Sequence, residues 1–518
     1  MTERQIPVAA ESHPIGWAEP VDCYTELTRI YGDHRVYLLE SLAGPADDRR
    51  HAYVGFGELM TLSVTRGVVR LTGLPALVDA VWRRVQPLLD GGPAGDGTAT
   101  GDGTGDGGGG TAAGGAGRVR SRLRSPADLW VLLRQMTSLF PAAEPGEEFS
   151  FGFLAFFGYD VARHIETLPY LIHAAPALPD ICLKLHQGCL RFDLRARSAE
   201  LLVHTSPGWP ELAVDELVCL LRSRARAGAQ LAGHPGGRPA LPPCTVAGTV
   251  TREEFLADVK RCLDHIAVGD IYQVQIGHEL TVRSTAGPLG VYHRLRARNP
   301  SPYMFLAPLA GHLLIGASPE LFVRVENGIV TMRPLAGTEP CGAQADIAVA
   351  ARRLLGDPKE LAEHVMLVDL CRNDIGRICQ PGTLNVPQML AIERFARVLH
   401  LVSTVTGRIG QRADVFDVIA AAFPAGTMTG TPKVRAMEII ESVERSRRGM
   451  YAGALGLLTS GYLNTALCIR TMVYGDGQYR LRASAGVVAD SQPEREWTET
   501  LAKLSAAHWA VTGQELLP

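Results

Sequence analysis

Two short turn sequences limit the fold of this 518-residue chain more than any other feature. In LFVRVENGIVTM (residues 321–332), two stretches rich in β-forming residues are joined by Asn327-Gly328, a dipeptide that favours a β-hairpin. The segment TMVYGDGQYRLRASAG (471–486) repeats this design around residues 475–477. We therefore predict antiparallel strands in an α+β fold, rather than alternating βαβ units. Longer helical patterns lie between the strands, at residues 357–374, 431–449 and 493–511.

Two polar stretches organise the chain. Residues 91–118 are half glycine and have no apolar pattern, so they cannot repay the entropy of ordering and we expect a disordered surface insertion. A second stretch, around 224–243, separates an N-terminal segment of mixed strands and helices (1–240) from a C-terminal block (245–518). The candidate chemistry lies in the C-terminal block.

Composition excludes several classes of protein. The 51 Lys and Arg residues nearly balance 54 Asp and Glu, so nothing favours binding to nucleic acid or a membrane surface. The first residues resemble no signal peptide and no stretch approaches the ~20 apolar residues of a membrane span, so we expect a cytoplasmic protein. The ten cysteines are scattered without Cys-x-x-Cys, which predicts free thiols.

Two of the expected helices begin at a proline, Pro358 and Pro493, and each carries two glutamates on one face. Residues three or four apart on a helix are neighbours, so these like charges repel unless a cation lies between them. Oxygen ligands of this kind suit Mg²⁺. The four side chains are Glu360, Glu363, Glu496 and Glu499.

Spacing alone leaves structural alternatives open for these glutamates. Glu360 is three residues after Asp357 and fits a helix-capping box. Glu499 and Lys503 fit an exposed ion pair of small energy. The metal site is therefore one hypothesis among these.

Three other residues are candidates for chemistry. Glu320, at a strand end, fits a general acid or a carboxylate at a helix start, and His400 fits an acid/base group or a satisfied core histidine. Arg470 lies in an apolar strand pattern, where a guanidinium requires an anionic partner in the protein or on a ligand. This favours a substrate that carries a carboxylate.

Several motifs between about residue 250 and 510 together resemble the chorismate-utilising enzymes, most closely the large subunit of anthranilate synthase. The sequence LLES at residues 38–41 extends the resemblance into the N-terminal segment. The resemblance implies antiparallel sheets packed as a sandwich with helices outside. The motifs are GDIYQVQ, NPSPYMFLA, LLIGASPELF, RPLAGT, DPKELAEHVMLVDLCRNDIGR, VLHLVSTVTG, FPAGTMTGTPKVRAMEII, IRTMVY and AGVVADSQPEREWTETLAK.

The resemblance also implies roles in binding chorismate. Glu363 and Glu499 would bind Mg²⁺ directly, with Glu360 and Glu496 acting through water, and the metal would hold the ring carboxylate. The enolpyruvyl carboxylate would be held by Arg470 and Tyr451. The rest of the substrate cradle, which includes backbone amides in tight turns, would be formed by Gly337, Thr338, Ser484, Ala485, Gly486 and Lys503.

Single residues separate the related reactions. Gln273 stands where enzymes that add water to chorismate carry a lysine base, and Ala336 stands where many aminodeoxychorismate synthases carry a nucleophilic lysine. The resemblance then implies that ammonia adds to C2 while Glu320, near Thr427, protonates the departing C4 hydroxyl, giving 2-amino-2-deoxyisochorismate. His400 would assist the elimination of pyruvate. The product would be anthranilate, in the first committed step of tryptophan biosynthesis.

The source of ammonia lies outside this chain. No Gly-x-Cys-x-Gly elbow is present, so we predict a separate glutamine amidotransferase subunit. Three alternatives stay open: an enzyme that stops at 2-amino-2-deoxyisochorismate, an atypical aminodeoxychorismate synthase without the lysine, and a non-catalytic tryptophan-sensing paralogue. The last would be expected to lose its charged site residues, because uncompensated carboxylates destabilise a protein.

The resemblance further implies a tryptophan site that controls activity. It lies between the LLES segment and the NPSPYMF segment. A packed sheet interface would use similar residues, so feedback inhibition is a hypothesis. The matching positions are Ser41, Pro302, Tyr303 and Met304.

Some residues depart from the family pattern. Ser484 replaces a usual glycine, and a Cβ at a position that requires positive φ would add strain. Glu339 and Cys341 stand where arginines are common, and Cys371 stands where glycine is usual. We expect the change at Ser484 to bear on substrate binding.

Overall fold

The computed structural model describes residues 5–45, 48–90, 117–141, 148–228, 241–341, 347–395 and 398–517. The expected insertion at 91–118 lies outside these residues up to position 116, and from Gly117 the chain already forms a strand. The expected separator at 224–243 begins later than predicted. A helix continues through Gly228 because Leu217 and Leu221 on its inner face are buried.

Two long strands form the centre of the N-terminal segment. β3 (His51–Thr65) and β8 (Ile181–Asp193) pair antiparallel along their whole length, and β8 is buried on both faces for most of that length. A bulge in this pairing lies between Glu58 and Met60. The other strands of this segment are β1 (Ala9–Pro14), β2 (Tyr37–Glu40), β4 (Val68–Gly73), β5 (Leu89–Asp90), β6 (Gly117–Leu123), β7 (Phe153–Phe157) and β9 (Ser198–Thr205).

Both predicted hairpins are confirmed in the C-terminal block. Asn327 and Gly328 have positive φ between β14 and β15, and Asp476 and Gly477 do so between β22 and β23. The strands of this block are β10 (Cys244–Gly248), β11 (Gln273–Ser284), β12 (Tyr303–Leu309), β13 (His312–Ser318), β14 (Leu321–Glu326), β15 (Ile329–Met332), β16 (Leu335–Pro340), β17 (Asn385–Phe395), β18 (Val398–Arg408), β19 (Gly430–Thr431), β20 (Ala454–Leu458), β21 (Leu463–Leu467), β22 (Thr471–Gly475) and β23 (Gln478–Val487).

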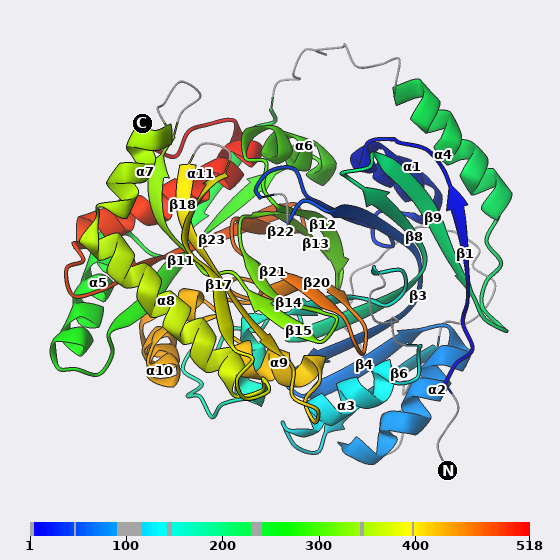
Figure 1. The fold of residues 1–518 in the computed structure, drawn as a ribbon, viewed down its shortest axis with the longest axis horizontal. Coiled ribbons are helices and arrows are strands. Elements are labelled where there is room, and N and C mark those ends of the chain that lie inside the picture. Colours follow the sequence, from blue (N-terminus) through cyan, green and yellow to red (C-terminus); the bar gives the residue numbers. More distant parts are fainter. Residues whose placement is uncertain are drawn as a thin grey trace.

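Helices cover the outside of the sheets (Figure 1). The expected helix at 431–449 ends earlier, at Val443, because Glu444 is extended and its buried carboxylate accepts the backbone N–H of Gly277. The helices are α1 (Pro20–Tyr31), α2 (Pro75–Val85), α3 (Asp128–Thr137), α4 (Val214–Gly228), α5 (Arg252–Ala267), α6 (Pro288–Arg298), α7 (Ile347–Leu355), α8 (Pro358–Gly376), α9 (Val415–Ala422), α10 (Lys433–Val443) and α11 (Pro493–Thr512), with 3-10 turns η1 (Gln86–Leu88), η2 (Tyr159–His164) and η3 (Gly426–Met428).

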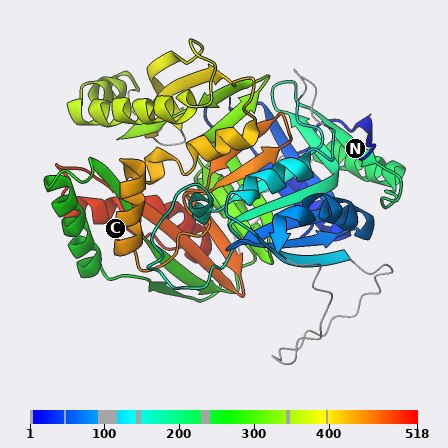
Figure 2. The ribbon, with the colours of Figure 1, turned by 90° about the horizontal axis from the view of Figure 1, so that it is seen from below.

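The N-terminal segment and the C-terminal block share hydrogen-bonded sheets. β2 pairs with β12, where Leu39 faces Phe305, and β7 pairs with β20, where Phe156 faces Leu455. All pairings between the described strands are antiparallel. The division at residues 240 and 245 therefore remains a prediction about the sequence, while the two parts lie together in space (Figure 2).

Side chains from both parts fill one hydrophobic cluster. Phe149 lies against Tyr53 and Tyr462, with ring centroids 5.7 and 5.8 Å apart, and Phe305 and Leu455 belong to the same cluster. The predicted α+β class, with antiparallel sheets and helices outside, is confirmed. No helix within the described ranges is long and apolar enough to cross a membrane. All ten cysteines are free thiols.

Candidate active site

Helices α8 and α11 bring the four predicted glutamates into one electrostatic group. α8 packs against β16 and β18, and α11 packs against β11 and β23. Burial raises the pKa of Glu363 to about 6, and the other three glutamates add to the rise although Lys359 opposes it. Burial also raises the pKa of Glu360 and of Glu496, and in both cases the charge of Glu499 adds to it. The carboxylates therefore repel one another.

Two lysines partly relieve this repulsion. Lys359 Nζ lies 3.7 Å from Glu363 Oε1, and Lys503 Nζ lies 2.7 Å from Glu499 Oε1. The ion pair that spacing left open for Glu499 is therefore present. Among the described residues, no three His, Cys, Asp or Glu side chains are close enough to each other to hold a metal ion.

The N-terminus of α8 is capped without using the carboxylate of Glu360. The side chain of Asp357 accepts the N–H groups of Lys359 and Glu360, at 2.9 and 3.3 Å. The N–H of Asp357 itself donates to the carbonyl of Leu354 at 3.4 Å. Glu360 is therefore not committed to a capping box and can face the other glutamates.

Glu320 lies between β13 and β14 and is 7% exposed. Its Oε1 accepts a hydrogen bond from Thr427 Oγ1 at 3.2 Å. Burial raises the pKa of Glu320 to about 8, although Thr427, Lys503 and Arg470 all lower it. The carboxyl group therefore carries a proton at neutral pH, as a general acid requires.

His400 lies on β18 and is buried. Its Nδ1 lies 2.7 Å from the carbonyl oxygen of Gly337, which only accepts, so Nδ1 carries the proton and Nε2 the lone pair. Burial lowers the pKa of His400 to about 4, which keeps the ring neutral. Gly337 has φ +65°, and a Cβ there would lie 2.9 Å from Leu354. The neighbouring Thr338 is placed by its backbone in β16, and its side chain lies outside the described atoms.

Arg470 is not inside a strand, as predicted, but between β21 and β22, with φ +49°. Burial lowers the pKa of Arg470, and Glu320 opposes this effect. In the part of the chain that the structure describes, no carboxylate forms an ion pair with its guanidinium. This cation is therefore available to an anionic ligand.

The substrate cradle predicted on β23 lies beside Tyr451 and Lys503. The hydroxyl oxygens of Tyr451 and Ser484 are 2.6 Å apart, and Lys503 Nζ donates to the carbonyl of Ser484 at 2.9 Å. A Cβ on Gly486 would lie 3.0 Å from Gln273 Nε2, so these two residues meet closely. Gln273 Oε1 is buried and accepts no hydrogen bond from the described residues.

The expectation of strain at Ser484 is wrong. Ser484 lies in the extended strand β23 and is not among the residues with positive φ. Gly277 faces it on β11, and a Cβ on Gly277 would lie 2.2 Å from the carbonyl oxygen of Ala483. The glycine that this close strand contact requires is Gly277, so a side chain at 484 is accommodated. Ala485 follows, fully buried.

A buried ionic network beneath the cradle was missed at the level of sequence. Glu444 binds Arg448 at 2.9 Å and Arg482 at 2.6 Å. Arg448 also donates to the carbonyls of Met428 and Gln275, both at 2.7 Å. The spacing of Glu444 and Arg448, four residues apart, is a signal that could have found this pair.

The other residues that depart from the family pattern are a paired strand residue, a partner in an ion pair and two buried thiols. Ala336 pairs with Leu401 on β18, and Glu339 lies 3.6 Å from Arg353. Cys341 is buried. Burial raises the pKa of Cys371, and the charge of nearby Glu320 contributes. The methyl group of Ala336 can act neither as a nucleophile nor as a cation.

The four residues of the predicted tryptophan site line one cavity. Pairing of β2 with β12 places Met304 opposite Glu40, which brings the LLES and NPSPYMF segments together. The cavity has a volume of about 80 Å³. The predicted residues that line it are Ser41, Pro302, Tyr303 and Met304.

The side chain of Asp48 occupies one wall of this cavity. Asp48 accepts hydrogen bonds from Tyr303 and Arg324, both at 3.0 Å, and also pairs with Arg333. The Asp48 side chain is 4% exposed. Its charge is therefore matched by protein cations alone.

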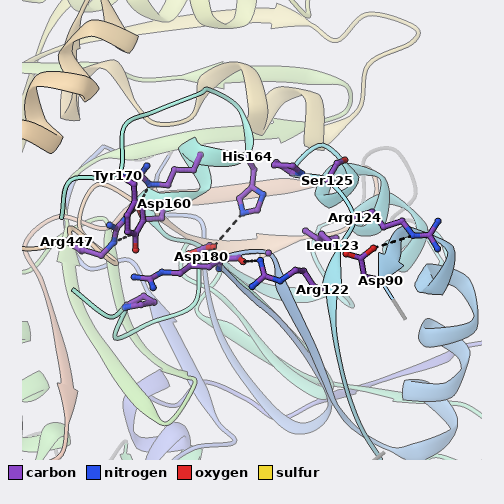
Figure 3. A pocket seen from close by; sticks show the side chains of 15 residues that line it. Asp90, Arg122, Leu123, Arg124, Ser125, Asp160, His164, Tyr170, Asp180 and Arg447 are labelled. Atoms are coloured by element: carbon purple, nitrogen blue, oxygen red, sulfur yellow. Dashed lines mark hydrogen bonds and ion pairs between the residues drawn. The ribbon is translucent and has the colours of Figure 1, made fainter. Parts of the chain in front are cut away.

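A second cavity, of about 460 Å³, is lined by other residues, among them Asp90, Arg122 and Asp180 (Figure 3). Two of its arginines, Arg163 and Arg447, pair with Asp160 and lie over the ring of Tyr170. Figure 3 shows Arg447 beside Asp160 and Tyr170. None of the predicted catalytic or substrate-binding residues lines it. The candidate active site is therefore the cradle around Glu320.

Comparison with known proteins identifies related sequences. A 2-amino-4-deoxychorismate synthase from Streptomyces globisporus is 57% identical over 496 residues, covering 95% of this chain and 94% of the relative. Anthranilate synthase component 1 from Streptomyces coelicolor is 42% identical over 397 residues, covering 74% of this chain and 77% of the relative.

Solved structures share the fold. Anthranilate synthase component I from Streptococcus pneumoniae has a TM-score of 0.66 at 27% identity, covering 88% of this chain and 92% of its own. The menaquinone-specific isochorismate synthase from Escherichia coli, at 15% identity, has a TM-score of 0.64 and covers 98% and 95%. The sequence profile of the chorismate binding enzymes matches residues 112–508. This chain therefore belongs to the family of chorismate-binding enzymes.

Proposed function

We propose that this enzyme adds ammonia to C2 of chorismate with loss of the C4 hydroxyl, and releases the aminated ring with its enolpyruvyl group attached. The observation that carries this proposal is 57% identity, over 95% of the chain, to a protein named 2-amino-4-deoxychorismate synthase. That name describes a ring with an amino group at C2 and no hydroxyl at C4. The name 2-amino-2-deoxyisochorismate describes the same ring.

Glu320 supports loss of the C4 hydroxyl. Hydroxide is a poor leaving group, so an acid must deliver a proton as the C–O bond breaks. With its pKa raised to about 8 by burial, Glu320 holds that proton at neutral pH. Thr427, which donates to Glu320 Oε1, leaves the other carboxyl oxygen free to carry the proton.

Gln273 supports ammonia as the nucleophile. An amide has no basic group at neutral pH, so Gln273 does not activate water. Its buried Oε1 accepts no hydrogen bond from the described residues and is suited to accept one from an N–H of ammonia, leaving the nitrogen lone pair for C2. We propose that a separate glutamine amidotransferase subunit supplies this ammonia, since the chain contains no Gly-x-Cys-x-Gly elbow.

We propose Mg²⁺ as the cofactor, held by Glu363 and Glu499 directly and by Glu360 and Glu496 through water. The donor set fits, because burial and neighbouring glutamates raise the pKa of Glu360, Glu363 and Glu496, and a cation removes that repulsion. The lysine contacts of Glu363 and Glu499 are the interactions that a metal would replace. When bound, Mg²⁺ neutralises the ring carboxylate of chorismate.

The chain's own cations hold the rest of the substrate. Arg470, which no described carboxylate neutralises, is proposed to bind the enolpyruvyl carboxylate beside Tyr451. Lys503 and the backbone of β23 at Ala485 and Gly486 complete the cradle. The carbonyl of Gly337 accepts the Nδ1 proton of His400 and so orients its ring.

Anthranilate formation is the second candidate function, and one observation favours it. His400 is neutral with its Nε2 lone pair unprotonated, which suits removal of a proton from C2 during loss of pyruvate. Relatives named anthranilate synthase component 1 also cover about three quarters of the chain. The two functions differ only in this last step.

Product analysis by mass spectrometry tests the proposal. Purified protein is incubated with chorismate, Mg²⁺ and ammonium, beside a chelator control and a control with glutamine in place of ammonium. We expect the mass of the aminated ring without equivalent pyruvate, lost with chelator and absent with glutamine alone. Stoichiometric anthranilate and pyruvate would instead establish the second candidate, and no consumption of chorismate would contradict both.

A further inference from the structure

Ser484 places a hydroxyl group next to the phenol of Tyr451 in the cradle. The two oxygens are 2.6 Å apart, and both side chains are buried, at 1% and 3% exposed. Water therefore cannot replace either partner. A residue without a hydroxyl at 484 would leave the Tyr451 phenol free to bind a ligand.

A count of protons fixes the direction of this hydrogen bond. Ser484 Oγ also donates to Gln275 Oε1 at 3.0 Å. A serine hydroxyl has one proton, so the short contact with Tyr451 must use the single proton of the phenol. Tyr451 therefore donates to Ser484 and retains only acceptor capacity towards a ligand.

The residues in this series of hydrogen bonds are held in place by Arg448. Arg448 lies under the ring of Tyr451, 5.8 Å from its centroid, and donates to the carbonyl of Gln275 at 2.7 Å. Arg448 is itself fixed by Glu444 at 2.9 Å. Arg448 therefore fixes Tyr451 and the backbone of Gln275, the two residues that flank Ser484 in this series of hydrogen bonds.

We propose that Ser484 is the positioning residue that determines the product, because it withholds the proton of Tyr451 from the enolpyruvyl group. This inference rests on the proposed function. During loss of pyruvate, a base takes the C2 proton, that electron pair forms the C2–C3 double bond, and the C3–O bond breaks. Enolpyruvate leaves with the electron pair on oxygen and then takes up a proton to become pyruvate.

The departing enolpyruvate gains a second negative charge, so donors at this place act mainly on the transition state. Two donors flank it in the proposed binding mode, Arg470 and Tyr451. With the phenol proton engaged by Ser484, only Arg470 donates. The barrier to elimination then remains high, and the aminated ring leaves the enzyme intact.

The test is the ratio of pyruvate to aminated ring formed by Ser484→Ala and Ser484→Gly with chorismate, Mg²⁺ and ammonium. One restored hydrogen bond corresponds to about a tenfold change in rate, so we expect the ratio to rise about tenfold in both variants. The ratio is independent of total activity. Alanine and glycine are smaller than serine, so both should fit in strand β23. Consumption of chorismate then shows that each variant is folded.

Two further variants separate this role from a structural one. Ser484→Thr keeps the hydroxyl and should keep the ratio of the unmodified enzyme. The double variant Ser484→Ala/Tyr451→Phe lacks the released proton and should return to that ratio. A ratio in Ser484→Ala equal to that of the unmodified enzyme, or a rise that persists in the double variant, would overturn the inference.

Failure of the proposed function has a different signature. If the unmodified enzyme already forms equivalent pyruvate and anthranilate, the arrest itself is absent and both proposals fall. If the unmodified enzyme arrests and both small variants arrest equally, the proposed function stands and only the role of Ser484 is lost.

Discussion

Two charged regions of this enzyme are built in opposite ways. In the cradle, burial and three neighbouring glutamates raise the pKa of Glu363, and burial keeps Glu320 protonated. In the cavity lined by residues of β2 and β12, the buried Asp48 is satisfied by Tyr303 and two arginines. A site that binds a ligand leaves its polar groups in need of partners, whereas a structural cluster satisfies them within the protein.

Replacing the acid of the cradle should have the largest effect. Glu320→Gln removes the transferable proton while keeping the shape and the hydrogen bond from Thr427. General acid catalysis contributes about 10²–10⁴ in rate, so we expect kcat for chorismate consumption to fall by that order. Steady-state assays with ammonium measure it. A fall in kcat of less than tenfold would contradict the role of Glu320 as general acid. Glu320 would then no longer differ in function from the structural carboxylate Asp48.

Removing one charge from the glutamate group should abolish the response to metal. Glu363→Gln is expected to lose Mg²⁺-dependent activity. We expect Mg²⁺ to raise the Tm of the unmodified enzyme but not that of the variant. The folded-state pKa of Glu363 is raised to about 6, so its ionisation costs stability as pH rises through that value. Without metal at neutral pH, the variant should therefore be at least as stable as the unmodified enzyme.

Asp48 should respond in the opposite direction. Asp48→Ala leaves Arg324 and Arg333 without this partner, and breaking a buried ion pair costs about 3–5 kcal/mol. Denaturant unfolding measures the change. The matched control is Asp369→Ala, an exposed carboxylate paired with Arg372 three residues on, for which about 0.5 kcal/mol is expected. Equal losses for the two variants would remove the distinction between a structural cluster and a surface pair.

A smaller effect tests how the acid is tuned within the cradle. The hydrogen bond from Thr427 lowers the pKa of Glu320, against the larger rise from burial. Thr427→Val removes the donor at similar volume, so that pKa should rise further. Since the protonated acid is active, the alkaline limb of the pH profile of kcat should move to higher pH. If Glu320 acted as its carboxylate, the acidic limb would move to higher pH instead, and the alkaline limb would stay where it is.

The sequence predicted the parts of the fold that depend on local chemistry. The Asn327-Gly328 and 475–477 turns specified their hairpins because positive φ favours these residues. The helix predicted at 431–449 ended early, because burial of Glu444 against Gly277 is a long-range contact. For the same reason, the pairing of β2 with β12 could be inferred only through resemblance.

In the candidate site too, local features could be predicted from the sequence, whereas long-range contacts could not. The glutamate pairs on α8 and α11 were visible from helical spacing, but their approach to each other depends on how two distant helices pack. The error at Ser484 arose because the glycine that the strand contact needs is Gly277, on the neighbouring strand. A single sequence does not state which strands are neighbours.

The last prediction concerns tryptophan, and its expected effect is the smallest. Ligand pockets for small molecules usually have volumes of about 300–1,000 Å³, whereas the cavity that Ser41 and Met304 line has about 80 Å³. To admit an indole, the side chains of Asp48 and Arg324 would have to separate, which breaks a satisfied buried pair. We therefore expect no inhibition by tryptophan in assays that extend to millimolar concentration. Inhibition at micromolar tryptophan would show that this region also binds a ligand. Satisfied polar groups would then no longer distinguish a structural cluster from a ligand site.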